Sequence, residues 1–184
     1  MTMAHQHRTI GSNERQGIAA HVERMNAAFC TIATPSLTQL VLRCALAVPF
    51  WRSGVNKWDG FLQLNDVAVL LFSSEFKLHL PGGPYTFPAP GIMAFAAGSA
   101  EILLPILLVL GLASRVAAFG LLIMTLVVQL TVPDGWPLHI TWAAMALGIM
   151  AWGPGRLSLD YLIQRFRRWS AQSEVKRGEG VGPP

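Results

Sequence analysis

Long apolar stretches with very few charges are the feature that most limits what this chain can fold into. Four such stretches occupy residues 37–58, 91–112, 115–132 and 136–152. A helix of about 20 residues is ~30 Å long, which matches the hydrocarbon core of a bilayer. The sequence therefore predicts an all-α, polytopic membrane protein built as a bundle of four transmembrane helices.

Composition favours lipid as the main environment and argues against nucleic acid as a partner. Hydrophobic residues make up 52% of the chain and charged residues only 13%, whereas a soluble domain has about 25% charged residues. The net charge is +4, but the basic residues are concentrated in the tails, without a base-reading or stacking motif. The two cysteines, Cys30 and Cys44, are not spaced as a zinc site or a dithiol motif. We therefore expect the lipid bilayer, and no nucleic acid, as a partner.

The chain divides into an N-terminal segment at 1–36, a membrane domain at 37–155 and a basic tail at 156–184. Residues 59–90 are too rich in proline and glycine to cross a membrane, and we predict an outer loop there. Outside the spans, ten lysines and arginines lie in the N-terminal segment, the turn at Arg115 and the tail, against one in the outer loop. Because cytoplasmic segments carry such an excess of positive charge, the sequence predicts a bacterial-type cytoplasmic (inner) membrane protein with both termini in the cytoplasm.

An apolar stripe in the N-terminal segment indicates an amphipathic helix. Its members recur at intervals of three and four residues: Ile18, Val22, Met25, Phe29 and Ile32. This spacing places them on one face of a helix. Two interpretations remain open, because such a helix either lies on the membrane surface or packs on the cytoplasmic end of the bundle.

Four charged side chains inside the predicted spans form the candidate functional cluster. Arg43, Arg52 and Lys57 belong to the first span, and Glu101 lies near the middle of the second. A charge at the centre of a membrane helix costs about 2.5–3.5 kcal/mol on insertion scales, so it normally has a partner or a function. Glu101 lies at a depth similar to both arginines, and we expect it either to pair with one of them or to belong to a proton or ligand site. The candidate cofactor-binding residues are Arg52, Lys57 and Glu101, and any catalytic group is sought among all four.

The three cations of the first span do not share one face of the helix. At 100° per residue, Arg43, Phe50, Gly54 and Lys57 fall close to one line, whereas Arg52 lies on the opposite side. The two arginines therefore cannot share a partner on a straight helix. Arg43 and Lys57 are close enough to the ends of the span to extend toward the headgroups.

Histidines give a weaker candidate for a metal site. His79 in the outer loop and His139 at the outer end of the fourth span are the pair considered for copper, with Met93 as a third ligand. Haem would require two axial histidines inside the bundle, but a single histidine falls within a span. The sequence also has no flavin or nucleotide fingerprint.

Several motifs in order resemble the DoxX family of small four-helix membrane proteins, over about residues 37–162. The first span begins LVLRCALAVPFW and continues with a G-x-x-K step from Gly54 to Lys57. The second contains AEILLPILLVLGLASR, from Ala100 to Arg115, and the membrane domain is followed by GPGRLSLD, from Gly153 to Asp160. Each motif is short, and it is their order along the chain that makes the resemblance specific.

The resemblance implies two kinds of function. Relatives in the family include the small membrane subunit of a thiosulfate:quinone oxidoreductase and proteins grouped with oxidative-stress enzymes. The sequence PDGWPLH at 133–139 is similar to a branch that accompanies copper-binding secreted peptides. The fold alone does not fix the activity, which has to be argued from the site.

Two functional hypotheses follow. The first is a redox accessory that binds quinone, or the membrane subunit of a quinone-linked oxidoreductase whose partner supplies the electrons. The second is a non-enzymatic membrane factor in copper or oxidative-stress handling that acts with a secreted or periplasmic metal-binding peptide. Either hypothesis implies a protein partner or a homo-oligomer. Whether the chain is itself an enzyme stays open.

Overall fold

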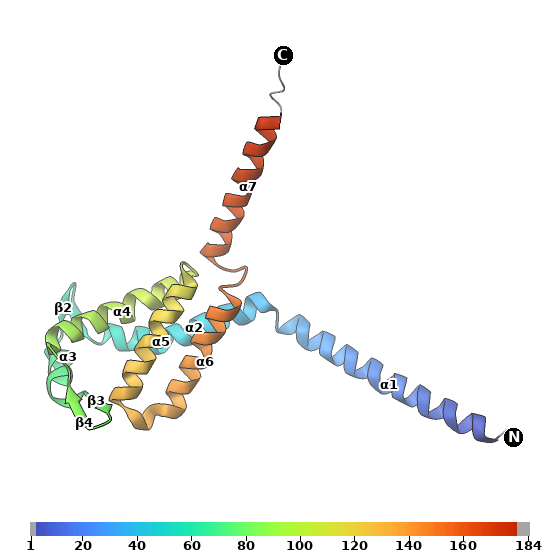
Figure 1. The fold of residues 1–184 in the computed structure, drawn as a ribbon, viewed down its shortest axis with the longest axis horizontal. Coiled ribbons are helices and arrows are strands. Elements are labelled where there is room, and N and C mark those ends of the chain that lie inside the picture. Colours follow the sequence, from blue (N-terminus) through green and yellow to red (C-terminus); the bar gives the residue numbers. More distant parts are fainter. Residues whose placement is uncertain (1–2, 180–184) are drawn as a thin grey trace, which may run out of the picture.

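Four helices of this computed structural model, which describes residues 3–179, pack into one bundle (Figure 1). They are α2 (Pro35–Val55), α4 (Pro90–Leu110), α5 (Ser114–Thr131) and α6 (Trp136–Trp152). Helix α2 packs on α4 and α6, and α5 packs on the same two helices, so the four form a closed ring. Its centre is filled by buried apolar side chains, the largest of which are Leu46, Phe50, Leu108, Leu121 and Ile149.

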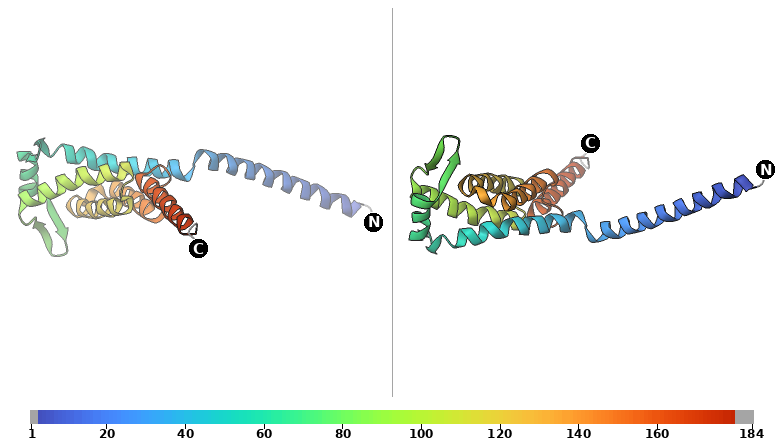
Figure 2. Two further views of the ribbon diagram at one scale, coloured as in Figure 1. Left: turned by 90° about the horizontal axis from the view of Figure 1, so that it is seen from above. Right: turned by 90° about the horizontal axis from the view of Figure 1, so that it is seen from below.

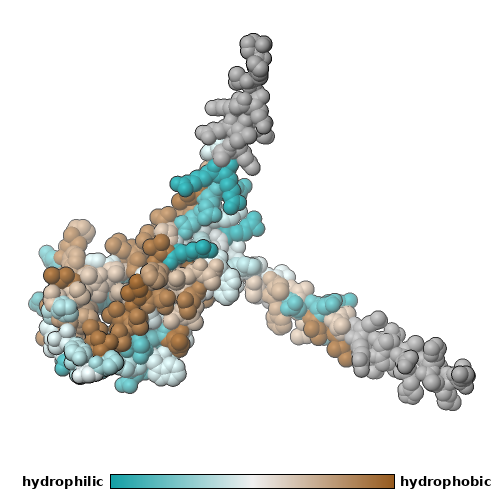
Figure 3. Space-filling model, viewed as in Figure 1, coloured by the Kyte–Doolittle hydropathy of each residue, from teal (hydrophilic) through white to brown (hydrophobic). Residues whose placement is uncertain are grey.

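The protein is mostly helical, and several of its helices are suited to a membrane. Among the described residues, α4 and α5 are long and apolar enough to cross a bilayer, and α2 joins them if it is counted with the helix before it, from which it is bent by 52°. Helix α6 has 17 residues, and the prediction of four crossings stays a prediction. Large apolar side chains on the outside of the bundle are exposed, as a lipid-facing surface requires: Leu103, Val116, Leu126 and Ile140. Figure 3 shows this apolar surface over the bundle and a hydrophilic surface where the C-terminal helix leaves it.

Local sequence signals explain where the bundle helices begin and end. Thr34 caps α2 by accepting a hydrogen bond from the backbone N–H of Leu37, and Pro35 occupies the first turn, where a missing N–H costs nothing. Helix α4 ends at Gly111, whose φ of 71° is left-handed, a conformation that glycine adopts without strain. Helix α6 is also followed by a glycine with a positive φ, Gly153 at 80°, although its ψ of −173° differs from that of a left-handed helical cap.

The loop between α2 and α4 is more regular than the sequence indicated. Its elements are β1 (Trp58–Gly60), β2 (Gln63–Leu64), α3 (Asp66–Leu70), a π-helical turn (Leu71–Glu75), β3 (Lys77–Leu80) and β4 (Gly83–Thr86). Strands β1 and β2 form one antiparallel hairpin, and β3 and β4 form another. Leu80 pairs with Gly83 across a turn of Pro81 and Gly82, and Gly82 has a left-handed φ of 102°. Proline followed by glycine suits this tight reversal, so residues expected only to break structure instead build a hairpin.

Two long helices extend from the end of the bundle opposite the hairpins (Figures 1 and 2). They are α1 (Met3–Ile32) and α7 (Leu159–Glu179). The described members of the α1 apolar stripe are all exposed: Ile18, Val22, Met25 and Phe29. The stripe therefore does not pack on the bundle, and this disfavours one of the two interpretations of the N-terminal helix. The side chain of Ile32 lies outside the described residues.

Candidate functional site

The site begins at a close crossing of α2 and α4, where Gly54 faces Glu101. A Cβ atom added to Gly54 would lie 2.9 Å from the backbone carbonyl carbon of Glu101 and 2.9 Å from its Cβ. These atoms belong to the helix itself and cannot move aside. Glycine at this position therefore lets the two backbones approach, as small residues do between membrane helices, and it sets the position of the Glu101 side chain.

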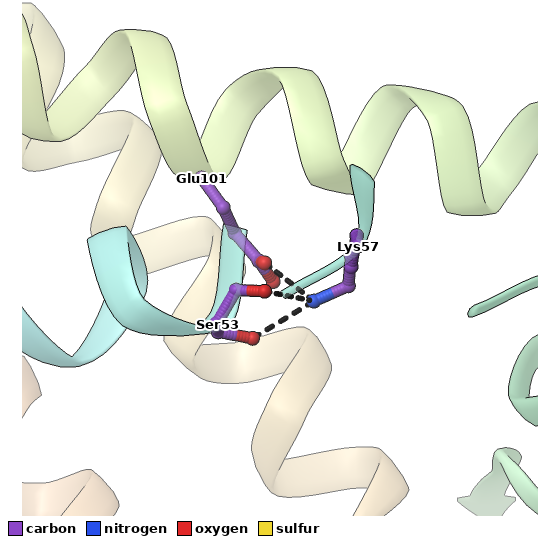
Figure 4. Close-up of polar contacts among 3 residues, drawn as sticks. All are labelled: Ser53, Lys57 and Glu101. Carbon is purple, nitrogen blue, oxygen red and sulfur yellow. Dashed lines mark hydrogen bonds and ion pairs between the residues drawn. The ribbon is translucent and has the colours of Figure 1, made fainter. Parts of the chain in front are cut away.

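An ion pair joins the two helices beside this crossing (Figure 4). The Lys57 ammonium donates to Glu101 Oε2 at 2.5 Å, and the exposed fractions of the two side chains are 13% and 6%. Lys57 Nζ also donates to the hydroxyl of Ser53 at 2.8 Å and lies 3.4 Å from the Ser53 carbonyl oxygen. The contact to the Ser53 carbonyl is long for a hydrogen bond, so one N–H of the ammonium group forms only a weak hydrogen bond.

An apolar cavity of about 450 Å³ opens next to the ion pair. Ser53, Lys57 and Glu101 form its polar side. The opposite side comes from the hairpin segment and from α4 and α5, and it includes Phe72, Phe76, Phe87, Met93, Met124 and Val127. Ligand pockets have volumes of about 300–1,000 Å³ and combine mostly apolar walls with a few polar groups. The cavity meets this description, and below it is called the outer cavity.

Glu101 pairs with Lys57, and neither arginine is its partner, so the arginine pairing expected from depth is wrong. The depth estimate assumed that the two antiparallel helices begin at the same level. In the structure Gly54, one residue before the end of α2, lies opposite Glu101, eleven residues after the start of α4 at Pro90. Helix α4 therefore extends about 15 Å (ten residues) beyond α2, at 1.5 Å per residue. Trp58 of β1 covers the overhang by packing its ring against Gly98 and Phe95.

Arg43 is fully buried at the other end of the bundle, with 0% of its surface exposed. Its guanidinium donates to the carbonyl oxygens of Leu108 and Val109, each at 3.4 Å, and to that of Leu157. The last carbonyls of a helix lack partners within the helix and carry partial negative charge. Arg43 therefore ties α2 to the end of α4 and to the segment before α7, instead of extending to the headgroups.

Arg52 lies on the exposed side of α2, as the helical projection predicts. The same projection places Arg43, Phe50, Gly54 and Lys57 toward the bundle, and all four are buried or partly buried. Where side chains are described, no ion pair involves Arg52. The structure therefore separates Arg52 from the candidate site and leaves Lys57 and Glu101 in it.

The two histidines considered for a metal have separate contacts. His79 Nδ1 lies 3.1 Å from the carbonyl oxygen of Leu130, which attaches the β3–β4 hairpin to α5. His139 Nδ1 lies 2.8 Å from Gln129 Oε1, and its ring packs against Trp142. Within the described part of the chain, no three His, Cys, Asp or Glu side chains are grouped as metal ligands. These contacts make both histidines parts of the local packing.

One feature of the site was missed in the sequence, and the position of another could not be predicted from it. Ser53 precedes Lys57 by four residues, a spacing that brings side chains together on a helix, and this signal was available. The wall formed by Phe72, Phe76 and Phe87 depends on the fold of the hairpin segment, which covers the N-terminal end of α4 and the C-terminal end of α5. Phe72 packs against both of the other rings, but only tertiary structure shows that they face a cavity.

The long apolar helices and their exposed apolar surface define this molecule as a small helical membrane protein. The chain belongs to the DoxX family, whose model matches residues 38–134. A second model, described as the TQO small subunit DoxD, matches residues 92–179. An uncharacterized protein of Haemophilus influenzae is 30% identical over 138 residues, covering 68% of this chain and 83% of the relative. No solved structure matches the chain.

Proposed function

We propose that this protein binds the ring of a quinone in the outer cavity and acts as the membrane subunit of an oxidoreductase system. One observation carries the proposal: a buried Lys57–Glu101 pair forms the polar side of an otherwise apolar cavity of about 450 Å³. Charged side chains within membrane helices often mark a ligand site or a proton path. The matching DoxD model is described as a TQO small subunit, which supports a role inside a larger complex.

The chemistry of the cavity suits a quinone. The aromatic and methionine side chains of its apolar wall pack well against a flat ring. A quinone carbonyl needs a hydrogen-bond donor, and Lys57 Nζ has one proton held only by the 3.4 Å contact to the Ser53 carbonyl. Glu101 keeps the ammonium group in place and is a proton acceptor beside the ring. The sequence has no flavin, haem or nucleotide motif, and in this proposal electrons come from a protein partner.

We further propose that the bundle crosses the membrane four times with both termini in the cytoplasm. Helix α6 would span about 26 Å at 1.5 Å per residue, and its 17 residues are at the lower limit of about 17–25 for a crossing. Both terminal helices leave from one end of the bundle, and four crossings require this arrangement. Positive charge concentrates at that end, which supports a cytoplasmic location. The outer cavity then faces the periplasmic side, and the exposed stripe of α1 lies on the inner membrane surface.

The test uses the full chain in mild detergent and decylubiquinone as the probe. Binding is followed by quenching of tryptophan fluorescence, and quinone that copurifies is extracted and quantified. Glu101→Gln removes the negative charge that holds Lys57, and we expect about tenfold weaker binding for the loss of one charge-assisted contact. The matched control is Glu75→Gln, because Glu75 is exposed on the loop; it should bind like the wild type.

A second variant protects the test against simple misfolding. Replacing Lys57 by Met and Glu101 by Leu together removes the polar side of the cavity without leaving a lone buried charge. We expect this double variant to remain folded and to lose quinone binding. The proposal is wrong if the wild-type protein binds no quinone, or if the folded double variant binds it equally well.

A further inference from the structure

A second, larger opening lies at the other end of the bundle. Figure 1 shows α7 leaving the bundle from this end. Its volume is about 1300 Å³, and it lies between the first turn of α2, the α4–α5 turn, the end of α6 and the start of α7. We call it the terminal cleft. Its walls include polar and charged side chains from all of these segments: Ser36, Gln39, Arg115, Arg156, Asp160 and Gln164. The terminal cleft shares no lining residue with the outer cavity.

Positive charge in the terminal cleft is not neutralised by acidic side chains. Arg115 and Arg156 are exposed, and among the residues whose side chains are described neither takes part in an ion pair. Arg156 instead lies over the ring of Tyr161, at 5.9 Å from its centroid. Two guanidinium groups are therefore available to an anion that enters the cleft, and planar guanidinium groups match phosphate oxygens well.

Asp160, the acidic group in the cleft, is already fully engaged. Its carboxylate accepts hydrogen bonds from the backbone N–H of Ala113 at 2.8 Å, and from the N–H and hydroxyl of Ser114 at 2.9 and 3.0 Å. These donors belong to the start of α5, where a carboxylate is favourable. Asp160 therefore caps α5 and does not neutralise the two arginines by direct contact.

A buried side chain without a partner supports a ligand at this position. Gln39 is 6% exposed and lines the cleft, and its Oε1 is buried without a hydrogen bond. An unpaired buried acceptor is costly, so the amide is suited to a molecule that brings its own donor. The first turn of α2, including Ser36, also faces the cleft, and the N-terminal end of a helix attracts anions.

Together these groups define the chemistry of the ligand. The two arginines favour an anion such as a phosphate, and the unpartnered Gln39 Oε1 favours a hydroxyl or ammonium donor close to it. Trp152 at the rim is 75% exposed, as expected for an aromatic side chain at a membrane interface. We infer that the terminal cleft binds the headgroup of an anionic phospholipid, with a phosphodiester held by Arg115 and Arg156 and a headgroup hydroxyl held by Gln39. The inference does not depend on quinone binding at the outer cavity.

The test measures lipid binding to the full chain in detergent by native mass spectrometry and by thermal shift. The probes are short-chain phosphatidylglycerol, short-chain phosphatidylcholine, glycerol 3-phosphate and inorganic phosphate. We expect phosphatidylglycerol to bind and to raise the unfolding temperature, and the other three to have much smaller effects. If glycerol 3-phosphate or inorganic phosphate binds as tightly as phosphatidylglycerol, the ligand is not a lipid. If phosphatidylcholine binds as tightly as phosphatidylglycerol, the cleft does not select an anionic headgroup.

Two charge-matched variants separate a site from general attraction to positive charge. Arg115→Gln with Arg156→Gln should weaken phosphatidylglycerol binding at least about tenfold, because both charge-assisted contacts are lost. Arg165→Gln with Arg167→Gln removes the same charge from α7 outside the cleft and should leave binding unchanged. Because all four side chains are exposed, both variants should unfold at the wild-type temperature without lipid. Equal binding by the two variants would overturn the inference.

Discussion

A double-mutant cycle on Lys57 and Glu101 tests the central contact of the structure. The pair joins α2 to α4 at 2.5 Å, with exposed fractions of 13% and 6%. Replacing either residue alone, by Lys57→Met or Glu101→Leu, leaves the other charge buried without its partner. Replacing both leaves two apolar side chains of similar length beside an apolar cavity. The cycle therefore distinguishes a direct contact from two charges that act independently.

The expected magnitudes follow from burial. Breaking a buried ion pair by removing one partner costs about 3–5 kcal/mol, whereas replacing both partners by apolar residues is often neutral or stabilising. The lower end applies here, because Lys57 keeps its bond to the Ser53 hydroxyl and is partly exposed. We expect each single variant to lose about 3 kcal/mol, and the unfolding temperature to fall by ~6–12 °C at about 2–4 °C per kcal/mol. The double variant should lie within about 1 kcal/mol of the wild type, so the coupling is several kcal/mol.

The assay is thermal unfolding of the purified chain in detergent, followed by tryptophan fluorescence. Arg52→Met and Glu75→Leu form the control cycle, because both residues are exposed and, in the region with described side chains, neither forms an ion pair. Their effects should be small and should add. If the effects of Lys57→Met and Glu101→Leu also add, the two side chains do not form the contact. The outer cavity then lacks the ion pair on which quinone binding was proposed.

Two further predictions concern the helix contacts that position the site. Gly54→Ala places a Cβ 2.9 Å from backbone and Cβ atoms of Glu101 and should lower the free energy of unfolding by about 1–3 kcal/mol. Gly91→Ala, where an added Cβ has nothing within 4 Å, should be neutral or slightly stabilising in the same thermal assay. Equal effects of the two substitutions would show that the helices do not cross closely at Gly54. Arg43→Met removes a buried guanidinium from three carbonyl oxygens and should lower the free energy of unfolding by about 3 kcal/mol. Arg52→Met, at an exposed position, should have only a small effect. Equally small effects of the two substitutions would refute the structural role of Arg43.

The helical period allowed the faces of α2 to be predicted, but sequence could not supply the partner of Glu101. A projection at a fixed angle per residue places Gly54 and Lys57 toward the bundle and Arg52 away from it, because helix geometry is local. The pairing of Glu101 depends on how far α4 slides along α2, and that offset comes from the packing of Gly54 against Glu101 and from the hairpin that covers the overhang. Contacts between residues 37 to 47 positions apart in the sequence decide both.

The hairpin segment shows a second limit of the same kind. Its prolines and glycines correctly indicated that residues 59–90 do not form a long helix, but the reversal at Pro81 and Gly82 was not predicted. Which faces of the strands are covered could not be predicted, because β3 (KLHL) alternates over only four residues and β4 (GPYT) does not alternate at all. The aromatic wall of the outer cavity therefore emerges only when the segment is placed over α4 and α5.

The two ends of the bundle use buried positive charge in different ways, and this separates structure from function. Arg43 is fully enclosed and donates to backbone carbonyls of the α4 end and the segment before α7, so a ligand could reach its guanidinium only by breaking the packing. Lys57 is held by side chains, Ser53 and Glu101, at the edge of a cavity, and side-chain contacts can rearrange without moving a helix. Arg43 is therefore a charge that the fold itself needs, whereas Lys57 can respond to a bound molecule. The outer cavity is therefore the better place to look for activity, and Arg43 is the better place to look for loss of the fold.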